Sequence, residues 1–263
     1  MIMFSWRAKR QLLLTGLVAA VFLGAGFWIF QKFLPVPSCV DSKQNQGEFG
    51  VDCGGPCGPC ELKHPQPITT FWARSVKVRE NVFDAAALIQ NQNEVLSSGH
   101  VVYEFALFDE FGLVTRKIGE TYLLAQERTP VIEPSIVTSR DPTRVEFRIV
   151  SVDWQVRKDI HPNVFAERRE YKVITAGEKK QSAVDVSVFN STSYDYKSVD
   201  VYVLVLDTDG NLLGTNRTVL ENVAAGSHNP IRFIWPGELA GITASVEVAT
   251  RLNIFDPELI LKP

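Results

Sequence analysis

The strongest constraint on this chain lies near its N-terminus, where residues 12–30 read LLLTGLVAAVFLGAGFWIF. The run carries no charge, and Thr15 is its one polar side chain. At about 1.5 Å rise per residue, roughly 20 residues cross the ~30 Å hydrocarbon core of a membrane. We therefore expect a single transmembrane helix over residues 11–34, with Pro35 and Pro37 ending it.

Three basic residues precede this run and predict its orientation. Arg7, Lys9 and Arg10 form a positive cluster, and such clusters stay on the cytoplasmic side of a membrane. We therefore expect residues 1–10 to be cytoplasmic and the bulk of the chain to be extracytoplasmic. The protein would cross the cell membrane once.

Two alternatives to an uncleaved anchor stay open. A signal peptide would have an apolar region of roughly 7 to 15 residues before a small-x-small cleavage site. Here the run is longer, and it is followed by QKFLPVPSC. The stretch Val36-Pro37-Ser38-Cys39 also loosely resembles the lipobox of bacterial lipoproteins, which would imply acylation of Cys39 after cleavage. Pro37 departs from that pattern.

All four cysteines lie in one glycine-rich segment, as Cys39, Cys53, Cys57 and Cys60. The last three have a C-x-x-x-C-x-x-C spacing that resembles the cluster-binding motif of radical S-adenosylmethionine enzymes, but no alternation of strands and helices follows to build their barrel. Four thiolates can also hold zinc, although the long gap after Cys39 leaves no second close pair. An even number of cysteines on the oxidising side of a membrane favours disulfides. We predict two disulfides, with all three pairings open.

The cysteine segment also carries acidic, amide and glycine residues at fixed spacings. With the cysteines, they are Cys39, Asp41, Asn45, Glu48, Gly50, Asp52, Cys53, Gly54, Gly55 and Cys57. This arrangement resembles a short module of bacterial surface and secreted proteins, usually written CxDGxxNxxExGxDCGGxC. Ser42 stands where that module has glycine. The resemblance implies an extracytoplasmic, disulfide-bonded spacer or interaction module without catalytic chemistry, which we assign to residues 35–65.

Four side chains of this segment supply oxygen ligands and form a candidate calcium site. Asp41, Asn45, Glu48 and Asp52 would lie in a tight loop, and carboxylate and amide oxygens are the ligands that calcium prefers. Their spacing differs from the alternating pattern of an EF-hand. In the alternative interpretation, the same side chains cap turns and bond to the local backbone.

The sequence beyond residue 66 predicts a mainly β structure. Short apolar and β-branched runs are separated by turn signals, without a long stretch of helical period. In residues 184–190, VDVSVFN, valines alternate with polar residues, which predicts one buried and one solvated face. Residues 199–207, VDVYVLVLD, are apolar on both faces toward their end, as expected for a central sandwich strand. The turn TDGN then predicts a hairpin.

The same pattern occurs twice, which predicts two tandem immunoglobulin-like β-sandwiches over residues 66–162 and 163–263. The two copies are about 98 residues apart, the size of one such domain. A junction at His161-Pro162-Asn163 is expected because proline interrupts a strand. The matching pairs are Asn91 with Asn190, Asp109 with Asp207, and Gly112 with Gly210.

The second copy contains an asparagine-ended strand at Val188-Phe189-Asn190, a long strand ending in Asp207 and a turn containing Gly210. This order resembles the small extracytoplasmic β-sandwiches of the FxLYD type, which occur mostly on membrane-anchored bacterial proteins. The resemblance implies binding or scaffolding without a defined ligand.

Charge and motifs exclude several classes of function. The net charge is −3, and the basic residues are scattered, so nucleic acid is not an expected partner. The four histidines each lie beside a turn or a proline, and the nucleophile-elbow, metalloprotease and phosphate-loop motifs do not occur. The stretch Asp207-x-Asp209-x-Asn211 copies the start of an EF-hand loop, but Leu212 stands where the required glycine would be. We expect no catalytic residues and no cofactor beyond the calcium candidate.

We therefore expect a membrane-anchored binding or structural protein of the bacterial cell envelope, with an envelope protein or polysaccharide as partner. One alternative is an accessory subunit of a secretion or pilus-type assembly, in which Ala20-x-x-x-Gly24 would pack against another helix. A second alternative is a thiol-redox or metal-dependent enzyme, which would need reduced or metal-bound cysteines.

Overall fold

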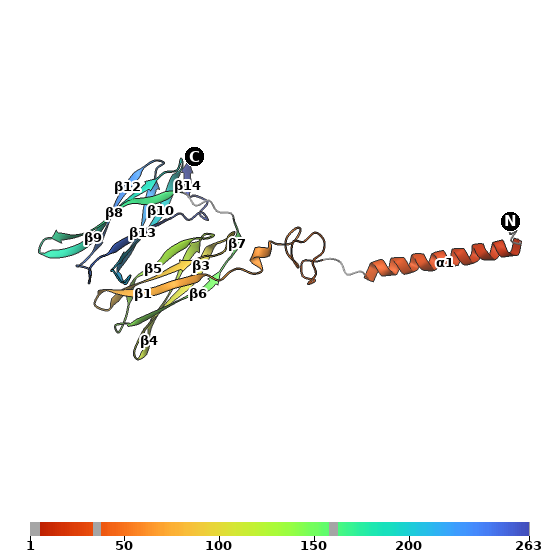
Figure 1. The fold of residues 1–263 in the computed structure, drawn as a ribbon, viewed down its shortest axis with the longest axis horizontal. Coiled ribbons are helices and arrows are strands. Elements are labelled where there is room, and N and C mark those ends of the chain that lie inside the picture. The colour runs from red at the N-terminus through yellow and green to blue at the C-terminus, as the bar shows by residue number, and fades with distance from the viewer. Residues whose placement is uncertain (1–5, 34–37, 158–162, 263) are drawn as a thin grey trace. The chain divides into compact units, whose positions relative to one another are not determined.

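The computed structural model describes residues 6–33, 38–157 and 163–262 (Figure 1). The chain divides into two compact units, Met1–Cys60 and Glu61–Pro263. We call residues 38–60 of the first the cysteine module, and the second the two-sandwich unit. The expected helix end and domain junction concern positions outside the described residues, namely Pro35, Pro37, His161 and Pro162.

Helix α1 (Trp6–Phe33) contains the apolar run. Its window Arg10–Phe30 is long and apolar enough to cross a membrane, and no part of that window is buried by the chain. Thr15 satisfies its hydroxyl within the helix by donating to the Gln11 carbonyl at 2.8 Å. Since so large an apolar surface is unfavourable in water, the helix requires an apolar environment. By length and composition, both a membrane anchor and a signal sequence fit.

The first sandwich consists of a three-stranded antiparallel sheet, β1-β2-β5, and a sheet β4-β3-β6 that carries the short β7 on β3. Its core lies between the two sheets and is rich in aromatic side chains, with Tyr103, Phe105 and Phe147 in mutual ring contact. Its strands are β1 (Thr69–Arg79), β2 (Val82–Gln90), β3 (Leu96–Asp109), β4 (Gly112–Leu123), β5 (Arg128–Val137), β6 (Arg144–Val152) and β7 (Gln155–Val156).

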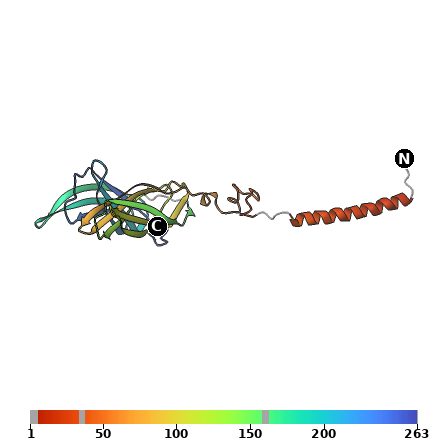
Figure 2. The same cartoon turned by 90° about the horizontal axis from the view of Figure 1, so that it is seen from below.

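The second sandwich repeats this topology strand for strand. Its sheets are β12-β9-β8 and β11-β10-β13, with β14 on β10 in the place of β7 on β3. The mainly β architecture with two tandem sandwiches is therefore confirmed (Figure 2). The strands are β8 (Val164–Ala176), β9 (Lys179–Asn190), β10 (Asp195–Leu206), β11 (Leu212–Val223), β12 (His228–Trp235), β13 (Ser245–Arg251) and β14 (Ile260–Lys262).

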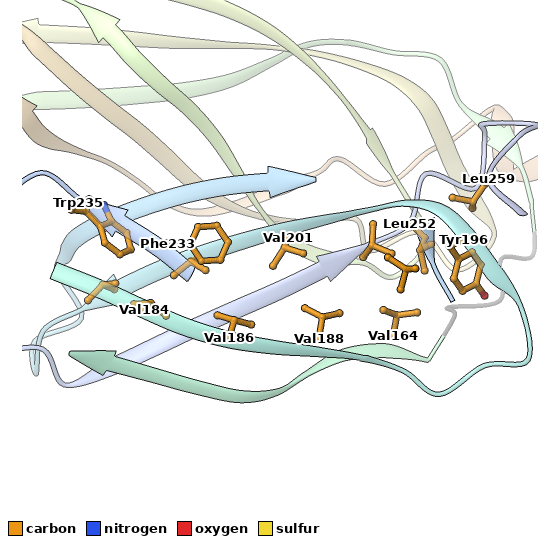
Figure 3. Close-up of a cluster of buried hydrophobic side chains, with 14 of the residues drawn as sticks. Val164, Val184, Val186, Val188, Tyr196, Val201, Phe233, Trp235, Leu252 and Leu259 are labelled. Atoms are coloured by element: carbon orange, nitrogen blue, oxygen red, sulfur yellow. The ribbon is translucent and has the colours of Figure 1, made fainter. Parts of the chain in front are cut away.

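The core of the second sandwich follows from the alternation in β9. Val184, Val186 and Val188 are buried and face Val201 of β10 across the sandwich, while Phe233 of the neighbouring strand β12 extends the same layer of the core (Figure 3). The intervening residues of β9 lie on its outer face, as the period of two requires. The hairpin expected at TDGN joins β10 to β11.

Equivalent asparagines fix the same corner of each sandwich. Asn91 directly follows β2, and Asn190 is the last residue of β9. Both side chains are fully buried. Asn91 Nδ2 donates to the Leu124 carbonyl at 2.8 Å, and Asn190 Nδ2 donates to the Val223 carbonyl at 3.3 Å. A buried backbone carbonyl without a partner is costly, so these amides explain why the sequence repeats asparagine at this position.

The two sandwiches pack against each other through the outer faces of two different sheets. The sheet β1-β2-β5 of the first meets β11-β10-β13 of the second. The apolar cluster between them consists of Ala86, Ile132, Tyr202, Leu204, Leu206 and Leu212, with Trp72, Val76 and Ala249 at its margin. The burial of both faces of β10 therefore has a cause beyond its central place in a sheet, because the other sandwich covers its outer face.

Candidate functional site

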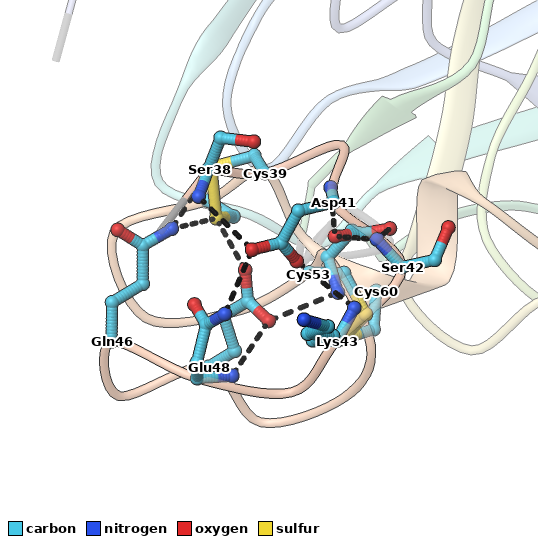
Figure 4. The surroundings of a disulfide bond; sticks show 12 residues. Ser38, Cys39, Asp41, Ser42, Lys43, Gln46, Glu48, Cys53 and Cys60 are labelled. Carbon is cyan, nitrogen blue, oxygen red and sulfur yellow. Dashed lines mark hydrogen bonds between the residues drawn. A yellow bond between two sulfur atoms is a disulfide. The ribbon is translucent and has the colours of Figure 1, made fainter. Parts of the chain in front are cut away.

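The cysteine module is held by two disulfides, Cys39–Cys57 and Cys53–Cys60 (Figure 4). The prediction of two disulfides is confirmed, and the pairing that sequence left open is resolved. All four sulfurs are engaged, so in this state they offer neither a thiolate nucleophile nor thiolate metal ligands.

Carboxylates organise the backbone between these cross-links. Asp52 Oδ1 accepts hydrogen bonds from the backbone nitrogens of Asp41 and Ser42, at 2.9 and 3.0 Å. Glu48 is buried, and its Oε2 accepts from the backbone nitrogens of Asp52 at 3.0 Å and Asn45 at 3.3 Å. Buried carboxylates bonded to backbone N–H groups stabilise tight turns in place of regular structure.

Asp41 completes this network. Its carboxylate accepts from Asn45 Nδ2 at 2.8 Å and from the backbone nitrogen of Lys43 at 2.9 Å. The bond from Asn45, followed by those from the backbone, lowers the pKa of Asp41 below its usual range. Ser42 has a φ of 60°, a left-handed conformation that glycine adopts more readily than serine.

The four candidate calcium ligands therefore lie in one small loop, but their oxygens mostly bind amides. Among the described residues, one group of three His, Cys, Asp or Glu ligand atoms lies within 4.8 Å of one another, and it joins Glu48 to the disulfide-bonded Cys39 and Cys57. The carboxylates of Asp41, Glu48 and Asp52 do not converge on a common point. The bonds to backbone amides account for the turns, whereas Asn45 Oδ1 is buried without a hydrogen-bond partner, and calcium stays a prediction.

A buried ion pair connects the two sandwiches. Arg251, at the end of β13, is 4% exposed, and its Nε and Nη2 donate to the two Glu127 carboxylate oxygens at 2.6 and 3.0 Å. Nη2 also donates to the Tyr122 carbonyl at 2.5 Å. Burial alone would lower the pKa of Arg251, but the Glu127 carboxylate and neighbouring tyrosines raise it above its usual range.

Aromatic rings complete this joint. The Arg251 guanidinium lies 4.1 Å from the ring centroid of Tyr122, and the Tyr122 hydroxyl donates to Asp200 Oδ2 at 2.9 Å. Burial, as the largest cause, raises the pKa of Tyr122, so this hydroxyl remains protonated at neutral pH. We call Arg251, Glu127, Tyr122 and Asp200 the joint. It fixes the second sandwich against the first by paired, desolvated groups.

An open groove with a volume of about 920 Å³ lies on the outer face of β12-β9-β8. Lys172, Asp185 and Arg232 form an ion-pair network there, with Arg232 Nε 2.5 Å from Asp185 Oδ1. Hydrogen bonds from Arg232 and then Lys172 lower the pKa of Asp185 to about 2. We call this surface the outward β9 face.

The opposite outer sheet, β4-β3-β6, carries a comparable ion pair. Glu104 Oε1 accepts from Arg148 Nε at 2.9 Å, and this bond is the main reason that the pKa of Glu104 is lowered. Four residues further along these strands, the Arg144 guanidinium lies 4.4 Å from the ring centroid of Phe108. We call this surface the outward β3 face.

The described histidines do not form a catalytic group. His100 lies 3.1 Å from Asp153, and His228 lies 3.0 Å from Glu167 on a different sandwich. His64 is exposed, and His161 is outside the described residues. The segment that resembles an EF-hand start is a turn, in which Asp207 Oδ1 accepts from the backbone nitrogens of Asp209 and Asn211 at 2.9 and 2.7 Å.

No protein-family model matches the chain, and the search of the curated proteins finds no match either. Sequence reasoning missed the joint and the two outward faces. A signal for the interface was present, because the run Ala85-Ala86-Ala87-Leu88-Ile89 is apolar on both faces of β2 and is therefore covered on both sides.

Proposed function

We propose that this protein is a single-pass, membrane-anchored binding or structural protein of the bacterial cell envelope. The observation that carries the proposal is helix α1, whose apolar window Arg10–Phe30 is not buried by the chain and is followed directly by a disulfide-bonded module. A lipid bilayer would supply the missing apolar environment. Disulfides form and persist on the oxidising side of a membrane, which supports an extracytoplasmic location for the remainder.

The two-sandwich unit would then be the part that meets a partner. The joint keeps the two sandwiches in a fixed arrangement, and the groove on the outward β9 face offers a concave surface with both charge signs. Such a surface suits an envelope protein or polysaccharide that makes polar contacts. We propose no catalytic step, because the charged groups of the joint and of the two outward faces are engaged in ion pairs.

The anchor is tested by placing charges in the helix of the full-length chain. Leu17→Lys with Val21→Lys should release the protein from alkaline-washed membranes, because each charge at the centre of a span costs about 2.5–3.5 kcal/mol. The matched control, Leu113→Lys with Val137→Lys, alters two exposed apolar side chains of the sandwiches and should leave the protein in the membrane fraction.

Mass measurement and protease treatment of spheroplasts complete the test. An intact chain of 29.4 kDa in the membrane, with the sandwiches accessible to external protease, would support the proposal. A protein that lacks its N-terminal residues and is found free of the membrane would contradict it and identify a cleaved signal sequence.

A further inference from the structure

The two sandwiches use opposite sheets to contact each other, so their interface is of the heterologous, head-to-tail kind. The first contributes β1-β2-β5, and the second contributes β11-β10-β13, which is the equivalent of β4-β3-β6. An interface between non-equivalent faces can propagate. The first sandwich still exposes the type of face that the second sandwich has used, and the second still exposes the type that the first has used. The outward β9 face and the outward β3 face are those two free ends.

Register shows what stands at the interface positions on the outward β9 face. Ala86 and Asp185 lie equally far before the equivalent asparagines of their sandwiches, so they are equivalent positions. Ala86 pairs with Ile132 across the sheet, and Asp185 pairs with Arg232. An apolar pair at the interface is thus replaced by an ion pair on the free face.

The third member of the network follows the same rule. Val76 pairs with Asp84 in the first sandwich, and Lys172 pairs with Ala183, the equivalent position, in the second. Val76 lies at the margin of the apolar interface cluster, whereas Lys172 forms an ion pair with Asp185. All three members of the charged network therefore occupy positions that are apolar in the interface.

On the outward β3 face, charged residues likewise stand at positions that carry uncharged residues in the interface. Glu104 and Tyr202 lie equally far before Asp109 and Asp207, and they pair with Arg148 and Ala249, respectively. Tyr202 belongs to the interface cluster, with Ala249 at its margin. The ion pair Glu104–Arg148 thus takes the place of an interface tyrosine and alanine.

Two apolar residues nevertheless remain on the outward β3 face at positions that are apolar in the interface. Ala106 and Phe108 are the equivalents of Leu204 and Leu206 in β10. On β10 these positions are covered by the first sandwich, whereas on β3 the Arg144 guanidinium lies over Phe108. Arg144 therefore covers an apolar side chain on β3 whose equivalent on β10 is covered by the other sandwich.

We infer that the two charged faces terminate the stack of sandwiches and prevent copies of this chain from associating head to tail through the geometry already used between its own repeats. Glu104 is already buried, but stacking would remove from water the exposed guanidinium groups of Arg148 and Arg232 and the partly exposed Lys172 and Asp185. Removing charges from water without a new partner is unfavourable. Charges at such positions are a known means of opposing edge or face association in β proteins. The inference depends on the sandwiches alone and not on the role of the helix.

The test transfers the interface residues to the free faces of the full-length chain in detergent. The first variant, Glu104→Tyr with Arg148→Ala, gives the outward β3 face the residues of β10 and β13. The second variant, Lys172→Val with Asp185→Ala and Arg232→Ile, gives the outward β9 face the residues of β1, β2 and β5. Analytical ultracentrifugation measures the mass of the protein in each sample.

The expected result is specific to a head-to-tail interface. Each variant alone should keep the mass of the unsubstituted protein, the two mixed in equal amounts should show a twofold rise, and the combined variant should form longer oligomers as concentration increases. Two controls remove the same charges elsewhere and should not associate. They are Glu178→Ala with Lys179→Val and Lys180→Ile at the β8–β9 hairpin, and Glu110→Tyr at the β3–β4 turn with Lys117→Ala in the edge strand β4.

Two results would overturn the inference. If the mixture retains the mass of its components while thermal melting shows that both are folded, then the charges do not oppose stacking. If the second variant alone forms a closed dimer, then a newly apolar surface is simply adhesive, and the repeat geometry is irrelevant. Should the triple substitution abolish cooperative melting, Asp185→Ala with Arg232→Ile provides the same mixing test with Lys172 retained.

Discussion

The cysteine module and the two-sandwich unit maintain their order by different means. The module has two disulfides and a set of carboxylates that accept from backbone N–H groups, and apolar residues such as Phe49 are largely exposed. The two-sandwich unit, in contrast, has two apolar cores, an apolar interface and a buried ion pair. A segment too short to bury a core thus relies on covalent links, and the longer segment relies on exclusion of water.

The joint should give the largest effect on stability. Arg251→Met leaves the Glu127 carboxylate buried without its partner, and we expect a loss of about 3–5 kcal/mol in the free energy of unfolding of the two-sandwich unit. Urea unfolding measures this loss. Adding Glu127→Leu should recover part of the stability, because the unpaired charge is then removed. A loss below about 1 kcal/mol for Arg251→Met would mean that water reaches the joint.

Removing a disulfide should destabilise the cysteine module rather than the two-sandwich unit. Cys39→Ser with Cys57→Ser opens a link between residues 18 apart in sequence, and we expect the module to lose about 3 kcal/mol. Hydrogen exchange should then increase at the amides bonded to Glu48 and Asp52, while the urea midpoint of the two-sandwich unit is unchanged. Simultaneous loss of both would show that the units do not fold independently.

The buried asparagines test whether the two repeats are energetically equivalent. Asn91→Ala and Asn190→Ala each leave buried carbonyls without donors, and each should cost about 1–3 kcal/mol. Aspartate at either position would also lose the donor and add a buried charge, so Asn91→Asp and Asn190→Asp should be more destabilising than alanine at pH 7. Urea unfolding of all four variants compares the repeats. A clear cost in one repeat alone would contradict their equivalence.

Lowering the pH should have the smallest of these effects on the stability of the two-sandwich unit. The pKa of Asp185 is about 2, below its ordinary value, because Arg232 and Lys172 donate to it. Its contribution to stability is therefore complete above its unfolded-state pKa of about 4 and is lost as the pH falls through about 2. NMR titration of the carboxyl group should give this pKa, and Arg232→Met should raise it. An unshifted pKa in the parent protein would mean that the ion pair is not formed in solution.

The sequence predicted those features that arise from local pattern. Alternation in residues 184–188 placed Val184, Val186 and Val188 in a core, and the matched Asn91 and Asn190 revealed a repeat whose strands the structure confirms. Four closely spaced cysteines predicted disulfides, but their pairing depends on how the loop turns in space, which spacing alone does not determine.

The joint could not be predicted because nothing local marks it. Arg251 and Glu127 are far apart in sequence, and each resembles a solvated charge on a strand or turn. Their burial results from the packing of one sandwich on the other, which brings Tyr122 and Tyr202 over the guanidinium. The role of the two outward faces could not be predicted from sequence either. Their charges are informative only when they are compared with the residues at equivalent positions in the interface.

The joint also determines how a force would pass through the protein. In a string of domains connected by a linker alone, a pull on one domain is relaxed by rotation at the linker before the next domain bears any load. Here an apolar contact surface and a desolvated ion pair act in parallel between the sandwiches, so bending them apart requires charge to be separated in a low-dielectric interior. We therefore expect a force applied to the second sandwich to be resisted at this interface and passed on to the first sandwich.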